Sequence, residues 1–270
     1  MSKILVTGGT GVLGRRVVDR LRGAGREVRV LSRSGRPGTV RGDLLKGAGL
    51  DEAVDGIKTI VHCASNPYRK TRQTDVGGTE LLLQAAARAG VSHVVFISIV
   101  GVDRNPYYPY FRVKLDAERV SERSPVPWTI LRATQFHDLM LRMLRLLDRL
   151  PAVMPIPRGL RFQPIDVGET ADRLVELALS PPAGRVPDVG GPEVLTSTEL
   201  AHAYLGATGR EKRIVELPLP GRAARAWREG AQLCPDQAYG RIRWEEFLRE
   251  KIHRQRIDEE SSGSVERPDR

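Results

Sequence analysis

Cysteine is scarce in this sequence, which contains only Cys63 and Cys234. Two cysteines are too few for the disulfide framework of a small secreted domain or for the four ligands of a structural zinc site. Apolar runs are also short, and none approaches the roughly 18 residues that a membrane-spanning helix needs. The N-terminus enters a glycine-rich turn directly and lacks the long apolar core of a signal peptide. We therefore expect a cytoplasmic protein without a metal site or a membrane partner.

Acidic residues are outnumbered, with 33 Asp and Glu against 43 Lys and Arg, which gives a net charge of +10. A basic surface can attract nucleic acid. Here arginine is spread along the chain without a dense basic run, zinc spacing or an aromatic-basic motif, so we do not expect a nucleic-acid partner. The excess is pronounced in one place, since residues 1–36 hold nine basic residues against two acidic ones.

The beginning of the chain carries its most informative motif. Residues 3–6 read as a short apolar strand, the turn Thr-Gly-Gly-Thr-Gly-Val-Leu-Gly follows at residues 7–14, and apolar residues then recur at helical spacing. This order predicts the phosphate-binding start of a dinucleotide fold. Glycines at Gly8, Gly11 and Gly14 permit a tight turn, a close approach to a pyrophosphate and close packing of helix on strand. The positive end of the helix dipole then faces the anion.

This glycine turn resembles that of the extended and atypical short-chain dehydrogenases/reductases, and the resemblance covers residues 1 to about 250. It implies an α/β fold, with a Rossmann-type doubly wound parallel sheet and a small C-terminal substrate lobe. We expect a single NAD(P)-binding domain over residues 1–256, whose lobe is built mainly from 136–165 and 191–256. The composition of residues 257–270 predicts a disordered tail.

The residues after the second predicted strand, 27–31, bear on the choice of cofactor. An Asp or Glu there would bind the ribose 2′-hydroxyl of NAD, but the sequence has none. Arg33 and Ser34 stand in its place, and arginine can accommodate the 2′-phosphate of NADP. An exposed loop arginine is the plainer alternative. We expect NADP(H).

Other strand ends supply further cofactor-binding candidates, because strand ends in an open parallel sheet face the ligand crevice. Cys63, Ala64 and Ser65 end the predicted strand 58–63. By resemblance, Asp43 and Leu44 hold the adenine edge, although Asp43 can equally cap the following helix. We interpret His62 as structural and Cys63 as a small buried residue rather than a nucleophile.

Tyr110 and Lys114 stand four residues apart on a predicted helix, so both side chains can share one face. Their spacing is the Tyr-x-x-x-Lys arrangement of the short-chain dehydrogenases. By resemblance, Tyr110 exchanges a proton with the substrate oxygen, while Lys114 lowers the phenol's pKa and binds the nicotinamide ribose. If Ser98 matches the first serine that the family has after this strand, the position of the usual catalytic Ser or Thr falls on Val100, and only Ser98 itself could take its place.

The segment from Ser98 to Lys114 looks most like the atypical NmrA-like branch, which includes quinone and isoflavone-type reductases and redox-sensing regulators. In that branch the segment after the sixth strand, Ala133 to Phe136, lies against the nicotinamide. The predicted catalytic residues are Tyr110 and Lys114. The predicted cofactor-binding residues are Gly8, Thr10, Gly11, Val12, Leu13, Gly14, Arg33, Ser34, Asp43, Leu44, Cys63, Ala64, Ser65, Ser98, Lys114, Ala133, Thr134, Gln135 and Phe136.

Two functions fit these patterns. The first is an NADP(H)-dependent oxidoreductase that reduces a small apolar or aromatic carbonyl, quinone or enone. The second is a non-catalytic NADP(H)-binding protein that reports redox state to a protein partner. The Tyr-x-x-x-Lys spacing favours the first and the missing serine favours the second. We expect a small-molecule substrate and a monomer or homodimer.

Overall fold

The computed structural model describes residues 3–263, with side chains through Arg254. Its centre is a seven-stranded sheet in the order β3-β2-β1-β4-β5-β6-β9, and every neighbouring pair is parallel. The strands are β1 (Lys3–Thr7), β2 (Val28–Ser32), β3 (Val40–Arg41), β4 (Ile57–His62), β5 (His93–Ile99), β6 (Trp128–Ala133) and β9 (Gly184–Arg185). The order reverses between β1 and β4, where doubly wound sheets bind their ligands. The predicted Rossmann-type sheet is confirmed.

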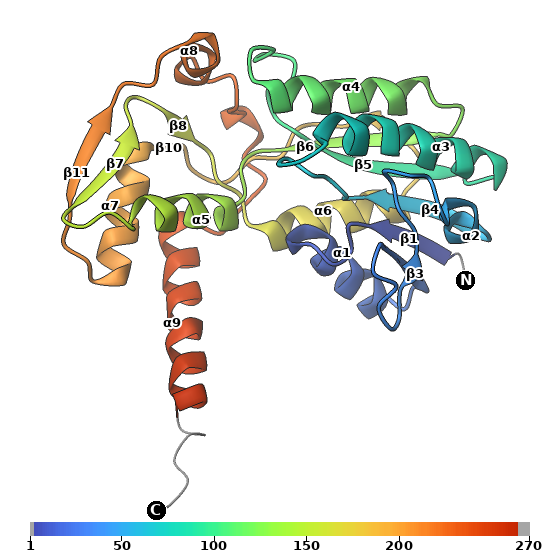
Figure 1. Cartoon of the computed structure of the whole chain (residues 1–270), viewed down its shortest axis with the longest axis horizontal. Coiled ribbons are helices and arrows are strands. Elements are labelled where there is room, and N and C mark those ends of the chain that lie inside the picture. Colours follow the sequence, from blue (N-terminus) through green and yellow to red (C-terminus); the bar gives the residue numbers. More distant parts are fainter. Residues whose placement is uncertain (1–2, 264–270) are drawn as a thin grey trace, which may run out of the picture.

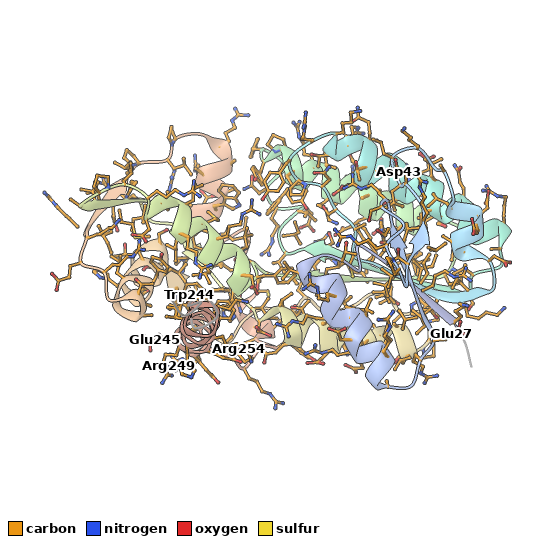
Figure 2. All side chains as sticks on the ribbon, turned by 60° about the horizontal axis from the view of Figure 1, so that its bottom comes forward. Glu27, Asp43, Trp244, Glu245, Arg249 and Arg254 are labelled. Atoms are coloured by element: carbon orange, nitrogen blue, oxygen red, sulfur yellow. The ribbon has the colours of Figure 1, made fainter. Side chains whose placement is uncertain are left out.

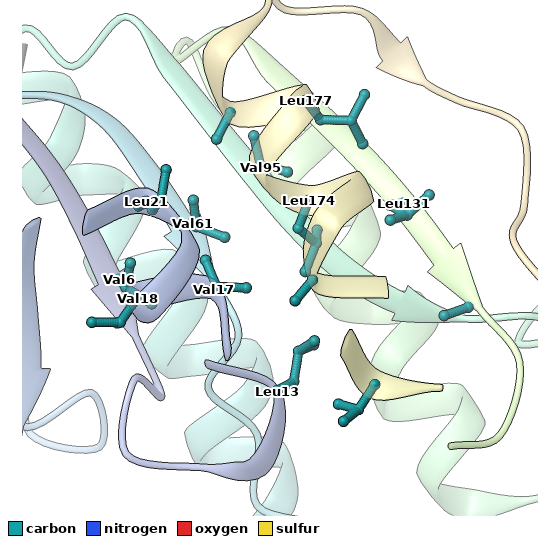
Figure 3. Close-up of a cluster of buried hydrophobic side chains, with 14 of the residues drawn as sticks. Val6, Leu13, Val17, Val18, Leu21, Val61, Val95, Leu131, Leu174 and Leu177 are labelled. Atoms are coloured by element: carbon teal, nitrogen blue, oxygen red, sulfur yellow. The ribbon is translucent and has the colours of Figure 1, made fainter. Parts of the chain in front are cut away.

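Helices cover both faces of this sheet (Figure 1). On one face, α1 (Val12–Gly23) packs against α6 (Val167–Leu179), and Leu13, Val17 and Leu21 meet Leu174 and Leu177 over the strands (Figure 3). The other face carries α2 (Leu50–Val54), the π-helical turn η1 (Gln73–Gly77), α3 (Gly78–Arg88) and α4 (Pro109–Arg123). The buried strands are apolar on both sides because both sides are covered.

A smaller lobe lies beyond the sheet and contains α5, β7, β8 and the elements from β10 to α9 (Figure 1). This lobe has a hydrophobic core of its own, which includes Met140, Met154, Tyr204 and Trp244. Trp244 begins the last helix in this lobe, well separated from Asp43 on the sheet side (Figure 2). The elements are α5 (His137–Leu147), β7 (Val153–Pro157), β8 (Arg161–Phe162), β10 (Leu195–Thr196), α7 (Ser197–Thr208), β11 (Arg213–Leu217), α8 (Arg222–Arg228), η2 (Pro235–Gln237) and α9 (Trp244–Gly263).

The C-terminal helix is longer than the sequence suggested. The composition predicted a disordered tail over residues 257–270, but α9 begins at Trp244 and continues to Gly263. Buried Trp244 and Leu248 anchor its start, and Glu250 pairs with Arg254 four residues later, which supports a helix. Lys, Arg and Glu are good helix formers even without an apolar stripe. Residues 264–270 lie outside the described part of the chain.

Three element boundaries follow from local backbone geometry. The π-helical turn η1 runs directly into α3, and β9 is limited to Gly184–Arg185. The helix α8 is short, because Gly221 and Gly230 both have positive φ and bracket it. Among the described residues, no helix is long and apolar enough to cross a membrane.

A buried ion pair fastens α4 to the sheet. Arg132 of β6 donates to both carboxylate oxygens of Glu118 on α4, at 2.8 and 2.6 Å, and both side chains are almost fully buried. Arg132 also reaches Asp103 at 2.9 Å. These partners raise the pKa of the Arg132 guanidinium above its usual value in spite of burial. The pair fixes the position of the helix that carries Tyr110 and Lys114.

Replacing Glu118 with alanine should destabilise the protein strongly. The change leaves the buried Arg132 guanidinium short of its bidentate partner, and losing one member of a buried pair costs about 3–5 kcal/mol. Urea unfolding followed by circular dichroism measures the loss. Asp51→Ala, which removes the exposed pair with Arg88, is the control and should cost less than about 1 kcal/mol. Equal losses of stability in Glu118→Ala and Asp51→Ala would contradict the conclusion that the buried ion pair holds α4 on the sheet.

Candidate functional site

The glycine turn between β1 and α1 is tightly packed against the end of β4. Gly8 has a φ of +67°, and a Cβ built on it would stand 2.7 Å from the backbone nitrogen of Ala64. A Cβ on Gly14 would collide with the carbonyl group of Gly8. Neither position accepts a side chain unless the backbone moves. The turn therefore holds the start of α1 directly at the β1/β4 switch point.

The N-terminus of α1 is prepared for an anion. Gly11 is its N-cap, no side chain caps it, and the first turn contains no acidic residue. The first backbone N–H groups of a helix lack intrahelical partners, and the dipole makes this end positive. A pyrophosphate supplies the acceptors and the negative charge that this end lacks.

A cleft of about 1090 Å³ opens beside this turn. Its walls carry four basic residues, Arg33, Arg36, Arg69 and Lys70, against the single carboxylate of Asp43. Such a surplus of positive charge suits a ligand with several phosphates. The glycine cradle, the uncapped helix and the basic wall together fit a nicotinamide dinucleotide.

Many of the predicted cofactor-binding residues line this cleft: Gly8, Thr10, Gly11, Arg33, Ser34, Asp43, Leu44, Cys63, Ala64 and Ser65. The other predicted cofactor-binding residues do not line it. Val12, Leu13 and Gly14 belong to the first turn of α1, while Ser98 lies at the end of β5. These assignments stay predictions, since no ligand contact tests them.

Asp43 has a local structural task as well. Its carboxylate accepts a hydrogen bond from the backbone nitrogen of Leu45 at 2.9 Å. It does not cap the next helix, because α2 begins after Gly49. Asp43 thus stabilises the turn that follows β3, and it also lines the cleft.

The loop after β4 contributes more to the cleft than its predicted residues Cys63, Ala64 and Ser65. Asn66, Pro67, Tyr68, Arg69 and Lys70 line the cleft as well, and none of these five was among the predicted site residues. The Tyr68 ring is exposed, and the guanidinium carbon of Arg142 on α5 lies 5.4 Å from its centre, so the loop meets the smaller lobe there. No periodicity or motif marked this loop, and only its place after a strand end pointed to the crevice.

Tyr110 lies in a hydrogen-bonded chain that sequence spacing did not predict. Its hydroxyl is 2.7 Å from the Ser65 Oγ, and Ser65 in turn donates to Asp75 at 2.5 Å. Ser65 is exposed at the cleft wall, whereas Asp75 is buried in η1. The phenol is therefore connected to the cleft through Ser65.

Lys114 is buried one helical turn from Tyr110. Its ammonium donates to the backbone carbonyl of Ile97 at 3.0 Å and lies 4.3 Å from the centre of the Phe96 ring. Burial lowers the pKa of Lys114, and the nearby Asp75 carboxylate opposes that shift. An ammonium has three N–H donors, so the bond to Ile97 leaves donors for another ligand.

The pKa of Tyr110 differs from the expectation that a neighbouring lysine lowers it. Burial raises the pKa to about 12, the Ser65 hydrogen bond opposes this rise, and the charge of Asp75 adds to it. The Lys114 ammonium is directed to the Ile97 carbonyl instead. Without a ligand, then, Tyr110 is held as a neutral phenol, the form that can donate a proton.

His62 and Cys63 have the structural character that their positions suggested. The His62 ring bonds to the hydroxyls of Thr7 at 2.6 Å and Thr79 at 2.9 Å, which ties β1 and β4 to α3. Burial lowers the pKa of His62 to about 3 and raises the pKa of the Cys63 thiol to about 12. A neutral imidazole with both nitrogens engaged and a protonated thiol are unsuited to base or nucleophile chemistry at neutral pH.

The residues around the end of β6 are largely engaged with the protein itself. Ala133 and Thr134 are buried, the Gln135 side chain donates to the Gln232 carbonyl at 3.4 Å, and Phe136 is the N-cap residue of α5. Val100, which replaces the usual serine, is fully buried. The buried Ser98 hydroxyl finds no hydrogen-bond partner among the described residues.

Comparison with known proteins agrees with this geometry. Residues 8–143 match a family described as NAD(P)H-binding. The chain belongs to this family. A reductase of (4-alkanoyl-5-oxo-2,5-dihydrofuran-3-yl)methyl phosphate from Streptomyces griseus is 32% identical over 229 residues, which are 79% of this chain and 77% of the relative. The photosystem II assembly factor Ycf39 of Trieres chinensis is 25% identical over 231 residues, or 80% and 72% of the two chains.

Solved structures extend the likeness to almost the whole NAD(P)H-binding chain. The Escherichia coli NADPH-dependent quinone oxidoreductase QOR2, solved with NADPH, has a TM-score of 0.78 and 16% identity over 92% of this chain and 99% of the other. A short-chain dehydrogenase/reductase superfamily protein from Agrobacterium tumefaciens, solved with NAD, has a TM-score of 0.74 and 22% identity, with coverage of 96% and 99%. At these identities the likeness shows a shared fold.

Gly14→Ala should abolish dinucleotide binding. The new Cβ meets the carbonyl of Gly8, so the start of α1 must move away from the phosphate position. Fluorescence titration with NADPH and NADH measures the loss. Gly23→Ala, at the other end of α1 with nothing within 4 Å of its new Cβ, is the matched control and should bind like the wild type. Unchanged binding by Gly14→Ala would contradict the assignment of this turn.

Proposed function

We propose that this protein is an NADPH-dependent reductase of a small apolar or aromatic carbonyl, quinone or enone. The single observation that carries the proposal is the position of the Tyr110 hydroxyl, hydrogen-bonded to cleft-lining Ser65 and one helical turn from Lys114. NADPH supplies a hydride when bound. Tyr110 is our choice for the proton donor to the substrate oxygen, and the spare N–H groups of Lys114 are suited to ribose hydroxyls.

Exposed apolar side chains beside the cleft support an apolar or aromatic substrate. Tyr68 lines the cleft with an exposed ring, and Arg142 of α5 lies against that ring. On α5 itself, Leu139, Met143 and Leu146 are exposed, although they do not line the cleft. The Streptomyces griseus relative, a reductase whose substrate name contains an oxo-dihydrofuran ring, supports the choice of a conjugated carbonyl compound.

The choice of NADP over NAD rests on Arg33 and Arg36, which line the cleft after β2 where no carboxylate stands. Their guanidinium groups suit the 2′-phosphate. Arg33→Ala should weaken NADPH binding about tenfold or more, because hydrogen bonds to charged groups contribute about 1.5–3 kcal/mol. Binding of NADH should hardly change. Calorimetric titration measures the affinities for NADPH and NADH separately. Arg22→Ala, which changes an exposed residue at the far end of α1, controls for the loss of one positive charge.

Tyr110→Phe should lower kcat about a hundredfold, since a positioned general acid contributes roughly 10²–10⁴. Its affinity for NADPH should stay unchanged. NADPH oxidation at 340 nm with a panel of quinones, cyclic enones and aldehydes measures the effect. Tyr107→Phe, which alters an exposed phenol in the preceding loop, is the control and should keep full activity. Full activity of Tyr110→Phe would show that the Tyr110 hydroxyl is not the proton donor.

A non-catalytic redox sensor is the second candidate function. Val100 in place of the usual serine favours it, and the relative named as an assembly factor is compatible with a binding role. A sensor would bind NADPH but would not oxidise it with any member of the panel. The cytoplasmic location, the monomer or homodimer state and the lack of a nucleic-acid partner stay predictions.

A further inference from the structure

The contacts around Ser65 fix the direction of its hydrogen bonds. Asp75 uses both carboxylate oxygens: one accepts from the Ser65 hydroxyl at 2.5 Å and the other from the Asn66 backbone nitrogen at 2.9 Å. A serine hydroxyl has a single hydrogen. Since Ser65 donates that hydrogen to Asp75, its oxygen is an acceptor toward Tyr110, 2.7 Å away. The phenol must be the donor in this contact.

Burial and position make this arrangement more than a surface contact. Asp75 is only 3% exposed and lies in η1, a π-helical turn that follows the cleft loop. Isolated π-helical turns occur frequently at functional sites. Ser65 comes from the end of β4, and Tyr110 comes from the first turn of α4, 45 residues further on. Three separate segments thus converge on one hydroxyl at the cleft wall.

We propose that Ser65 and Asp75 are positioning residues for Tyr110 and perform the task that the serine missing at Val100 performs elsewhere. The proposal rests on the proposed reductase function. Asp75 orients Ser65, and Ser65 holds the Tyr110 hydroxyl toward the cleft. Sequence position gives no hint of this substitution, because Ser65 follows β4 and the usual serine follows β5.

The pair also has a task after proton transfer. The Tyr110 O–H bond breaks, the proton forms a new O–H bond on the substrate oxygen, and the electron pair stays on the phenolate. Ser65 then turns its hydrogen from Asp75 to the phenolate oxygen and stabilises it. A solvent proton, delivered at the exposed Ser65, restores the phenol. The Asp75 carboxylate disfavours a lasting phenolate, and so promotes this return.

Lys114 gives a second reason for a buried carboxylate at this place. Burial lowers the pKa of the lysine, and Asp75 is the main neighbouring charge that opposes the shift. One carboxylate therefore acts on both functional groups of α4: it orients the hydroxyl that holds Tyr110, and it helps to keep Lys114 charged.

Ser65→Ala, Ser65→Thr and Asp75→Asn test the proposal. In steady-state assays at saturating NADPH, Ser65→Ala should reduce kcat about ten- to hundredfold, as expected for the loss of a strong hydrogen bond. Ser65→Thr keeps a hydroxyl and should recover most of the activity. Asp75→Asn should reduce kcat as well, because the amide holds Ser65 less firmly.

A second measurement needs neither cofactor nor substrate. Absorbance titration of tyrosinate in the free protein, with Tyr110→Phe subtracted, follows the Tyr110 phenol alone. Asp75→Asn removes a negative charge and should lower the pKa from about 12. Ser65→Ala removes a hydrogen bond that lowers the pKa of Tyr110 and should therefore raise it. A role of Ser65 and Asp75 in folding alone would not produce these opposite effects.

The outcomes separate this proposal from the proposed function. Wild-type kcat in Ser65→Ala and Asp75→Asn, together with an impaired Tyr110→Phe, would overturn the positioning roles and leave the reductase in place. Wild-type kcat in Tyr110→Phe would overturn the catalytic assignment itself, and the positioning roles with it. An unchanged Tyr110 pKa in Asp75→Asn would show that the carboxylate does not act on the phenol, which also overturns the proposal.

Discussion

The absence of space between Gly8 and Ala64 is the constraint on which the site depends. β1 and β4 are neighbours in the sheet, yet the chain leaves them in different directions, and the turn after β1 passes over the end of β4 with no room for a Cβ. Gly14 must in turn approach the Gly8 carbonyl. Because both contacts are close, the N-terminus of α1 stands at the sheet edge, where its free N–H groups face the cleft. A looser turn would move this positive end away from its ligand.

The second feature of the site is a firmly held helix, α4. The buried pair of Arg132 and Glu118 fixes its middle to β6, while the Lys114 ammonium reaches the Ile97 carbonyl of β5. Tyr110 occupies the N-terminal turn of the same helix and needs no support from a residue at Val100, since Ser65 reaches its hydroxyl from β4. A rigid helix and a partner from another strand together define where the phenol lies.

Local signals were enough to predict much of this architecture. The glycine turn and the apolar strands indicated the doubly wound sheet. Helix caps are local in the same way: Asp166 accepts from the backbone nitrogens of Gly168 and Glu169, and Thr196 forms a capping box with Glu199. Each of these features involves residues within a few positions of one another, so the sequence displays them directly.

Features that need distant contacts were not predictable in the same way. The chain from Tyr110 through Ser65 to Asp75 joins a strand end, a π-helical turn and a helix. The rim at Tyr68 exists because the loop after β4 meets α5 of the smaller lobe. Neither arrangement leaves a periodic pattern in the sequence. The polar composition of residues 257–270 gave no sign that α9 extends to Gly263, because the buried residues that hold this helix, Trp244 and Leu248, lie near its start.

Hydride transfer is the central claim, and isotope transfer tests it most directly. The protein would be incubated with a cyclic enone and NADPH that carries deuterium at C4, using the 4R and 4S forms in separate reactions, and the product analysed by mass spectrometry. The account predicts a product with a single deuterium from one of the two forms and none from the other. Unconsumed NADPH, or a product without deuterium from either form, would contradict it.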